Sequence, residues 1–227
     1  LLIGADFAFS GVNGFTGETY LVFGGNFTPD AGTQVGGAGT QTLSATQGAA
    51  VDRLIGGAGD DTLVSDGGDD ILIGGEGDDT LAIPDATFAS RRLQGGLGTD
   101  TLRLDGSGMH LDLTSIADNR IEEIEVIDIT GSGDNMLTVD LQEVLNLSDH
   151  SNTLLVRRDS GDTVNIGGGW SQQANETIGP DDFEVFTQGA ATIKVQAPPA
   201  VSLTLGDQVW IDRNFNGTFD PGIDLAP

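Results

Sequence analysis

The 227-residue chain contains no cysteine, a single lysine and no apolar run long enough to span a bilayer. Without cysteine, neither disulfides nor thiolate metal sites can stabilise the fold. The 9 basic residues face 35 acidic ones, which gives a formal net charge of -26. We therefore expect no nucleic-acid binding and no membrane insertion, because a polyanion is repelled by both partners. Such a chain attracts cations.

Residues typical of catalysis are also scarce. The chain has no cysteine nucleophile, and His110 and His150 lie far apart without metal-ligand spacing. Ser107 lies in Gly-Ser-Gly rather than in the G-x-S-x-G nucleophile elbow. Neighbouring acids such as Asp60 and Asp61 suit general acid-base work in a cleft, but their regular spacing favours metal ligation. We expect no enzymatic activity in this chain.

Glycine, in contrast, is abundant, with 35 residues, and much of it follows a nine-residue period. The template is G-G-x-G-x-D-x-U-x, where U is a large aliphatic residue. Four segments follow it, namely GGAGDDTLV (56–64), SDGGDDILI (65–73), GGEGDDTLA (74–82) and GGLGTDTLR (95–103). A degenerate copy, GGAGTQTLS (36–44), has Gln41 in place of the aspartate, and residues 47–52 keep the period and end on Asp52.

Each repeat predicts one turn followed by one short strand. Glycines at positions 1, 2 and 4 permit left-handed backbone conformations, and the aspartate at position 6 ends the turn. The aliphatic residue at position 8 points inward; these residues are Leu63, Leu72, Leu81 and Leu102. One repeat cannot bury its leucine alone, so we expect a solenoid with two repeats, about 18 residues, per coil.

Stacking of this kind places Asp61 above Asp79, and their charges repel one another. A hard divalent cation that prefers oxygen ligands removes that repulsion, and carboxylates with carbonyls suit calcium. The alternative, an acidic glycine-rich linker, does not explain the aliphatic residue at position 8 of all four repeats. We expect the position-5 acids Asp60, Asp69 and Asp78 to face solvent.

The repeats resemble the RTX calcium-binding β-roll of secreted bacterial proteins. The resemblance implies Ca²⁺ between stacked turns, bound by carbonyls of positions 2 and 4 and the aspartate of one turn. The next turn on that edge adds carbonyls of positions 1 and 3 and its own aspartate. The implied first site is Gly57, Gly59, Asp61, Gly74, Glu76 and Asp79; the second is Gly48, Ala50, Asp52, Ser65, Gly67 and Asp70; the third is Gly75, Gly77, Asp79, Gly95, Leu97 and Asp100.

The N-terminal segment resembles the end of an FG-GAP repeat, the blade unit of integrin-type β-propellers. The residues that carry the resemblance are IGA (3–5) and GETYLVFG (17–24). An ordinary hairpin is the alternative. In the family, an acidic calcium loop precedes the strand that corresponds to LLIGA (1–5), and that loop is missing here.

Residues 104–196 are similar to the β-rich segment that follows RTX repeats in some large bacterial surface proteins. The resemblance rests on LDGSGMHLDLTSIADNRIEEIEVIDITGSG (104–133) and RRDSGDTVNIGGGW (157–170). The segment alternates apolar and polar residues, which predicts strands at 109–113, 124–129, 153–158, 163–166, 184–187 and 192–195. A helix should start after Asp140, with Leu141, Val144 and Leu145 on one face. We expect the segment to extend and cap the roll, with Trp170 closing its core.

The last residues look like the start of a B-type repeat of bacterial cell-wall adhesins (Sdr type), from GDQVWID (206–212) onward. The spacing repeats the logic of the EF-hand loop, and a polar turn without metal is the alternative. The implied ligands are Asp212, Asn214, Asn216, Thr218, Asp220 and Asp224; the last lies one position later than the usual acid.

The sequence therefore predicts an all-β protein, namely a calcium-stabilised parallel β-roll continued by a β-rich cap and flanked by short pieces of other β modules. The expected divisions are 1–30 (FG-GAP-like), 31–103 (RTX roll), 104–196 (cap), 197–204 (linker) and 205–227 (B-type). The expected function is a non-enzymatic calcium-binding module of a large secreted or surface adhesin-like protein. Two alternatives stay open: a secretion appendage of an extracellular hydrolase or toxin, or glycan or peptide binding by 104–196.

Overall fold

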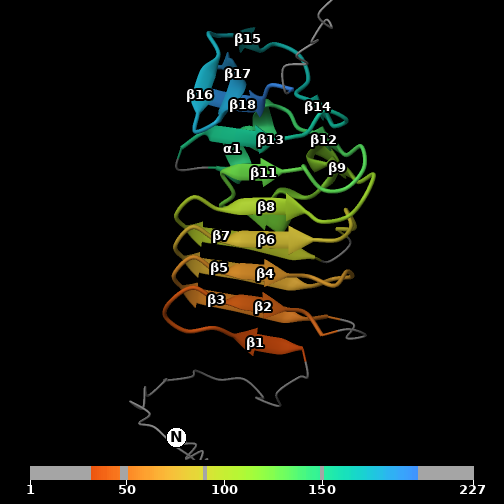
Figure 1. Ribbon diagram of the computed structural model, residues 1–227, viewed down its shortest axis with the longest axis vertical. Helices are drawn as coiled ribbons and strands as arrows, with labels where there is room; N and C mark the ends of the chain where they lie inside the picture. Colours follow the sequence, from red (N-terminus) through yellow and green to blue (C-terminus); the bar gives the residue numbers. More distant parts are fainter. Residues whose placement is uncertain (1–31, 47–50, 89–90, 149–150, 199–227) are drawn as a thin grey trace, which may run out of the picture.

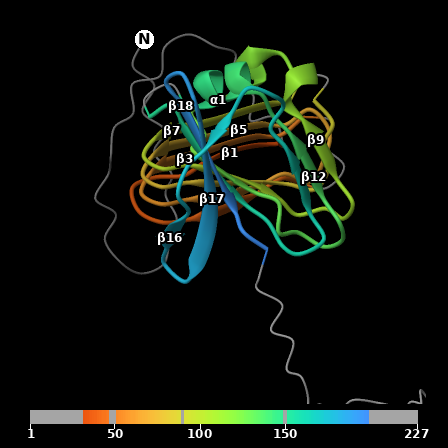
Figure 2. The same cartoon turned by 90° about the horizontal axis from the view of Figure 1, so that it is seen from above.

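The computed structural model describes residues 32–46, 51–88, 91–148 and 151–198 (Figure 1). The FG-GAP-like segment and the B-type segment lie outside these ranges. Within them the chain winds into a stack of flat coils. As far as residue 128 each coil adds one strand to each of two facing sheets, and beyond it only one of these sheets continues (Figures 1 and 2).

Two sheets form the walls of the roll, and their strands are parallel except for those within residues 171–188 at the end of the second sheet. The first has the order β1 (Thr33–Val35), β3 (Arg53–Ala58), β5 (Ile71–Glu76), β7 (Arg92–Leu97) and β10 (Ile121–Glu122). The second runs β2 (Thr42–Ser44), β4 (Thr62–Val64), β6 (Thr80–Ile83), β8 (Thr101–Leu104), β11 (Val126–Asp128), β13 (Thr153–Arg157), β18 (Ala191–Gln196), β17 (Asp181–Gln188) and β15 (Ser171–Gln172), with β16 (Glu176–Ile178) beside β17. The all-β fold class and the parallel β-roll are confirmed.

The core of the roll is a double column of leucines, one from each sheet. In the first sheet Leu54, Leu72 and Leu93 are aligned, and in the second Leu63, Leu81 and Leu102. All six side chains are fully buried. Two repeats per coil, with position 8 turned inward, is thus the arrangement that the nine-residue period predicts.

The third coil is longer than the second, but its strands keep their pairing. Leu72 faces Leu93 and Leu81 faces Leu102, while glycines 75 and 96 stay aligned. The additional residues lie in the connection between β6 and β7. The departure from the 18-residue spacing therefore leaves the turn of the fourth repeat in place.

Both sheets continue without a break into residues 104–196, because β10 pairs with β7 and β11 with β8, in parallel. A small third sheet, β9 (His110–Asp112), β12 (Met136–Thr138) and β14 (Thr163–Asn165), lies beside them (Figure 2). The strands expected in this segment are present. At the end of the second sheet, β17 lies beside β18 and is antiparallel to it (Figure 1). The domain boundaries themselves stay a prediction.

The expected helix is α1 (Leu141–Leu147), and Asp140 caps it by accepting hydrogen bonds from the backbone N–H groups of Gln142 and Glu143. Val144 and Leu147 are buried. Short 3₁₀ turns, η1 (Leu113–Ser115) and η2 (Asp118–Arg120), precede it. Trp170 packs against the core and donates its indole N–H to the Ile166 carbonyl at 2.6 Å.

Candidate metal centre

The turns of the roll gather on two opposite edges. Edge A consists of the turns 36–41, 56–61, 74–79 and 95–100, which lead from the first sheet to the second and lie on the left in Figure 1. Edge B consists of the turns that end at Asp52, Asp70 and Arg91 and lead back to the first sheet. Successive coils bring equivalent positions of each edge on top of one another.

On edge A the position-6 side chains form a hydrogen-bonded ladder. The backbone N–H of Asp61 donates to Oδ1 of Asp79 at 2.7 Å, and the N–H of Asp79 donates to Oδ1 of Asp100 at 2.8 Å. The N–H of Gln41 donates to Asp61 at 2.7 Å, and that of Asp100 to Glu125 at 2.9 Å. One oxygen of each aspartate is thereby fixed against its neighbouring coil.

The second oxygen of each of these aspartates is buried and unpaired. Within the described residues, Oδ2 of Asp61, Asp79 and Asp100 has no hydrogen-bond partner, and the three side chains are at most 2% exposed. A buried carboxylate oxygen without a partner is strongly unfavourable. A positive group beside each of these oxygens would offset that cost.

Glycine lets the unpaired oxygen and a carbonyl oxygen of the next turn approach the same Cα atom. A Cβ atom built on Gly56 would lie 2.5 Å from Oδ2 of Asp61 and 2.6 Å from the Gly74 carbonyl oxygen. A Cβ on Gly74 would meet Oδ2 of Asp79 and the Gly95 carbonyl in the same way. A carboxylate oxygen and the position-1 carbonyl of the next turn thus lie together beside one glycine Cα atom. These oxygen donors fit calcium.

Burial also shifts the acidity of these carboxyl groups. It raises the pKa of Asp79 above the ordinary value, and the charges of Asp61, Asp60 and Asp78 add to the effect. Burial raises the pKa of Asp100 to about 7, with further contributions from Asp79 and Glu125. Without a cation the folded edge therefore resists carrying its full negative charge.

The structure brings the other expected edge A ligands to the same turns. Gly57, Gly59, Gly75 and Gly77 have left-handed φ angles of 114°, 101°, 125° and 118°. The position-3 carbonyls of Glu76 and Leu97 accept hydrogen bonds from the preceding turn at 2.7 and 2.8 Å, which leaves each a second lone pair. The proposed ligand sets for the first and third sites are thus compatible with the fold.

Gln41 shows what the turn does without an aspartate. Its amide nitrogen donates to the position-4 carbonyl of Gly39 at 2.7 Å, and its amide oxygen accepts from the Gly37 N–H at 2.9 Å. An electropositive N–H group thus contacts one of the carbonyls that the resemblance assigns to calcium. The degenerate turn is closed by its own side chain.

The position-5 acids of edge A behave differently. Asp60 and Asp78 are exposed, as expected. Each accepts a hydrogen bond from the next coil: Oδ1 of Asp60 from the N–H of Asp78 at 2.9 Å, and Oδ1 of Asp78 from the N–H of Thr99 at 2.7 Å. They join neighbouring coils at the surface.

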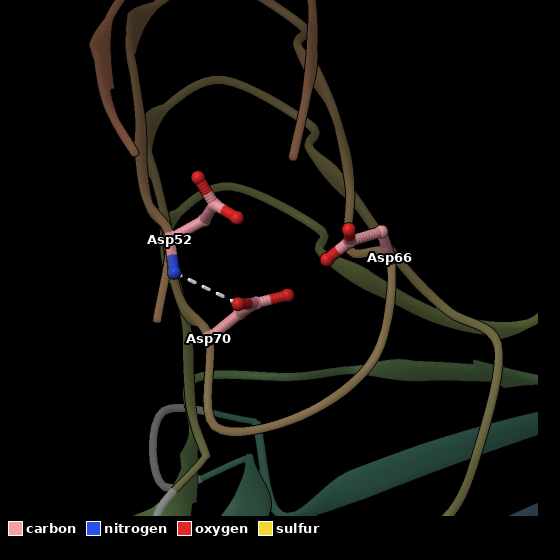
Figure 3. A group of neighbouring side chains, drawn as sticks. All are labelled: Asp52, Asp66 and Asp70. Atoms are coloured by element: carbon pink, nitrogen blue, oxygen red, sulfur yellow. Dashed lines mark hydrogen bonds between the residues drawn. The ribbon is translucent and has the colours of Figure 1, made fainter. Parts of the chain in front are cut away.

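Edge B carries three converging carboxylates, of Asp52, Asp66 and Asp70 (Figure 3). One oxygen of each lies within 4.8 Å of the others. The N–H of Asp52 donates to Oδ1 of Asp70 at 2.9 Å, as on edge A. Asp52 is fully buried, and neither of its oxygens has a hydrogen bond of good geometry within the described part of the chain, although the backbone of Thr46 lies close enough to act against the rise of its pKa. Burial and the charges of Asp70 and Asp66 raise its pKa.

The turn at 65–70 does not follow the backbone of the edge A turns. Its left-handed residues are Gly67 (112°) and Gly68 (78°), at positions 3 and 4 rather than 2 and 4. Ser65 Oγ donates to Oδ2 of Asp70 at 2.6 Å and orients that carboxylate. The carbonyls of this turn therefore do not occupy the places that those of edge A occupy. Gly48 and Ala50, also expected in this site, lie outside the described residues.

Asp66 is a candidate ligand that the repeat template does not predict. The template has glycine at position 2, so an acid there reads only as a departure from the pattern. Its exposed side chain points toward Asp52 and Asp70 (Figure 3). The signal in the sequence is the acid in place of glycine in SDGGDD.

Arg91 ends the carboxylate column of edge B. It directly precedes β7, as Asp52 precedes β3 and Asp70 precedes β5. Its guanidinium is fully buried, donates to both carboxylate oxygens of Asp85 at 3.2 Å and to the Asp85 carbonyl at 2.8 Å, and lies 5.4 Å from the Phe88 ring centre. Burial alone would raise the pKa of Asp85, but the hydrogen bonds from Arg91 and Thr87 hold it below its usual value. A built-in cation thus occupies the third coil of this edge.

The remaining expected ligands belong to the C-terminal segment. These ligands lie outside the described residues, and their role stays a prediction; they are Asp212, Asn214, Asn216, Thr218, Asp220 and Asp224.

Of the described helices, none has the length and apolar character needed to cross a bilayer. His110 is exposed, and its ring Nε2 lies 3.1 Å from Thr138 Oγ1.

Comparison with known protein families gives a match at residues 46–81, to the RTX calcium-binding nonapeptide repeat, in four copies. The match covers both edges of the first two regular coils. Comparison with curated proteins gave no significant match. The chain therefore contains RTX repeats, and repeats of this kind bind Ca²⁺.

Proposed function

We propose that this chain is a structural module whose folding is driven by calcium. The observation that carries the proposal is the column of buried, unpaired carboxylate oxygens that lie beside position-1 carbonyls on edge A. Calcium supplies the missing charge at these oxygens. The leucine core of the roll holds the turns of successive coils next to one another.

The proposed ligands on edge A are those of the two stacked pairs of turns. One site takes the carbonyls of Gly57, Gly59, Gly74 and Glu76 with Asp61 and Asp79; the next takes those of Gly75, Gly77, Gly95 and Leu97 with Asp79 and Asp100. On edge B, Asp52 and Asp70 bind together with Asp66. The resemblance assigns carbonyls of Gly48, Ala50, Ser65 and Gly67 to the same site, but the turn at 65–70 does not present its carbonyls as the edge A turns do. Asp79 therefore serves two sites.

The mechanism is linkage between binding and folding. The oxygens of one site come from turns on successive coils, so the unfolded chain offers no comparable site, and calcium stabilises only the folded form. Extracellular calcium modules bind at about 10⁻⁴ to 10⁻³ M. The chain would stay unfolded at the low calcium level of a cell interior and fold after export.

Calcium titration of the whole chain, followed by far-ultraviolet circular dichroism and by urea unfolding, tests this proposal. We expect β structure to form with calcium and the unfolding midpoint to rise with its concentration. Magnesium is the control, because it prefers fewer ligands and a rigid octahedral geometry. Equal unfolding midpoints in calcium and in excess chelator would overturn the proposal.

We further propose that the module belongs to a large secreted or surface protein of adhesin type. Support comes from the RTX repeats, from the net charge of -26 and from the resemblance of both flanks to extracellular β modules. The complete reading frame tests this, since more propeller and B-type modules are expected on either side. A catalytic domain upstream instead would make the roll an appendage of a secreted enzyme.

A further inference from the structure

We propose that an additional calcium ion binds where the last repeat meets the extension, between the turn 95–100 and the short turn formed by Glu123, Ile124 and Glu125. This inference rests on the proposed function, because it treats the edge A oxygens grouped at Gly56 and Gly74 as calcium ligands. The short turn lies outside the nonapeptide pattern, and its sequence, EIE within RIEEIEV, carries no glycine.

The oxygens beside Gly95 repeat the arrangement of the two preceding turns. A Cβ atom built on Gly95 would lie 2.6 Å from Oδ2 of Asp100 and would meet the carbonyl oxygen of Glu123. At Gly56 and Gly74 the same two places are taken by a position-6 carboxylate and a position-1 carbonyl. Glu123 therefore presents its carbonyl where the next turn of the roll would present that of a glycine.

Pairing of the strands explains this placement. Ile121 and Glu122 of β10 face Leu93 and Gln94 of β7, so Glu123 follows at the level of Gly95. Its φ angle is 58°, the left-handed conformation that lets so short a turn reverse direction. Its own carboxylate is held outside the turn by the Gln94 amide, at 3.0 Å.

Glu125 takes the level of the position-6 aspartate. It directly precedes β11 just as Asp100 directly precedes β8, and its Oε2 accepts the Asp100 N–H at 2.9 Å. This is the contact that Asp79 and Asp100 make with the coils before them. The short turn thus offers one carbonyl and one carboxylate toward the last repeat.

The decisive observation is the state of Asp100. Its side chain is fully buried, and Oδ2, which lies beside Gly95, has no hydrogen-bond partner within the described residues. Gly96 and Gly98 share the left-handed conformation of the other edge A turns, at 120° and 140°. Their carbonyls, with Asp100, Glu123 and Glu125, form an oxygen-only ligand set suited to calcium.

The test compares Glu125→Gln with Glu122→Gln in the full chain, with bound calcium counted by native mass spectrometry and affinities measured by calorimetry. Both variants lose one negative charge, but Glu122 pairs with Arg92 at the surface, at 2.7 Å. We expect Glu125→Gln to bind one calcium ion fewer, or to weaken one binding step at least about tenfold, as loss of a ligand does. The Glu122→Gln variant should bind like the unmodified chain.

Equal calcium counts and affinities in both variants would overturn this site alone, provided that the unmodified chain binds calcium. If the unmodified chain binds none, the proposed function fails together with it. A second measurement does not depend on a variant: crystals of the unmodified chain containing a lanthanide should give an anomalous peak at about 2.3–2.6 Å from Oδ2 of Asp100. Peaks at Gly56 and Gly74 without one at Gly95 would again exclude the junction site.

Discussion

Replacing Asp79 with asparagine should destabilise the chain in calcium and leave it equally or more stable in chelator. Asparagine keeps an oxygen that can accept the Asp61 N–H, now at 2.7 Å from Oδ1. In place of the unpaired Oδ2 it puts an N–H₂ group, which cannot bind a cation. The ladder between coils is retained and only the metal ligand is lost.

The size of the effect follows from the position of Asp79 between two proposed sites. Calcium at 100 times its dissociation constant stabilises a folded site by about 2.7 kcal/mol. Loss of both sites would thus remove about 5 kcal/mol of calcium-dependent stability, a large share of the total for a typical domain. In chelator, asparagine removes a buried charge whose pKa is raised by burial, and its amide can donate to a carbonyl as Gln41 does.

Urea unfolding of Asp79→Asn in saturating calcium and in chelator, followed by circular dichroism, measures both effects. The matched control is Asp78→Asn, one residue earlier, exposed and with an acceptor retained for Thr99. The control should lose little in either condition. Equal losses of calcium-dependent stability in the two variants would refute metal ligation by Asp79.

Three further predictions concern residues outside this column. Asp66→Asn should weaken one calcium-binding step about tenfold or more in calorimetry, whereas the exposed Asp60→Asn should not; equal affinities would remove Asp66 from the edge B site. Glu143 has a pKa raised to about 7 by burial and by Asp118, Asp140 and Asp112, so its stabilising contribution is complete below about pH 4.5 and is lost as the pH rises through 7. Glu143→Gln should therefore raise stability at pH 8 by on the order of 1 kcal/mol, after allowance for solvent screening, and leave it unchanged at pH 4; a gain of the same size at both would contradict the assignment. Arg91→Gln should cost about 2–3 kcal/mol by leaving Asp85 without its partner, to the same extent in calcium and in chelator, because this cation is covalently part of the chain; a loss confined to calcium would show that Arg91 acts through a metal site.

The periodic part of the fold can be predicted from the sequence because each repeat specifies its own geometry. Leucine at position 8 determines which side chain enters the core, and the nine-residue period determines which turns stack. The period alone therefore places Asp61 and Asp79 on one edge, and the hydrogen bond between them shows that they are stacked there. Helix α1 is predictable for a similar local reason, since Asp140 is a strong N-cap.

Features that depend on contacts between distant segments cannot be predicted in this way. Asp66 lies near Asp52 only because two coils stack. The repeat template has glycine at this position, so the template does not identify Asp66 as a ligand. Glu123 and Glu125 enter edge A through the pairing of β10 with β7, which no local pattern in RIEEIEV indicates. From the sequence alone, Arg91 would be expected at the surface. It is buried because the loop that carries Asp85 and Phe88 packs against it.

Coil length varies along the roll without loss of strand pairing. The repeat turns of edge A keep their length, whereas the connections of edge B differ in length. Hydrogen-bonded partners on edge A are 18 residues apart in one pair of coils, 21 in the next and 25 at the junction. The first increase is taken up between β6 and β7, away from the edge A ligands. That connection can therefore differ in length, as loops commonly do, provided that the contact between Asp85 and Arg91 is kept. A peptide inserted there would be held on a folded coil in calcium and on an unfolded chain in chelator, so the same scaffold would order its presentation reversibly.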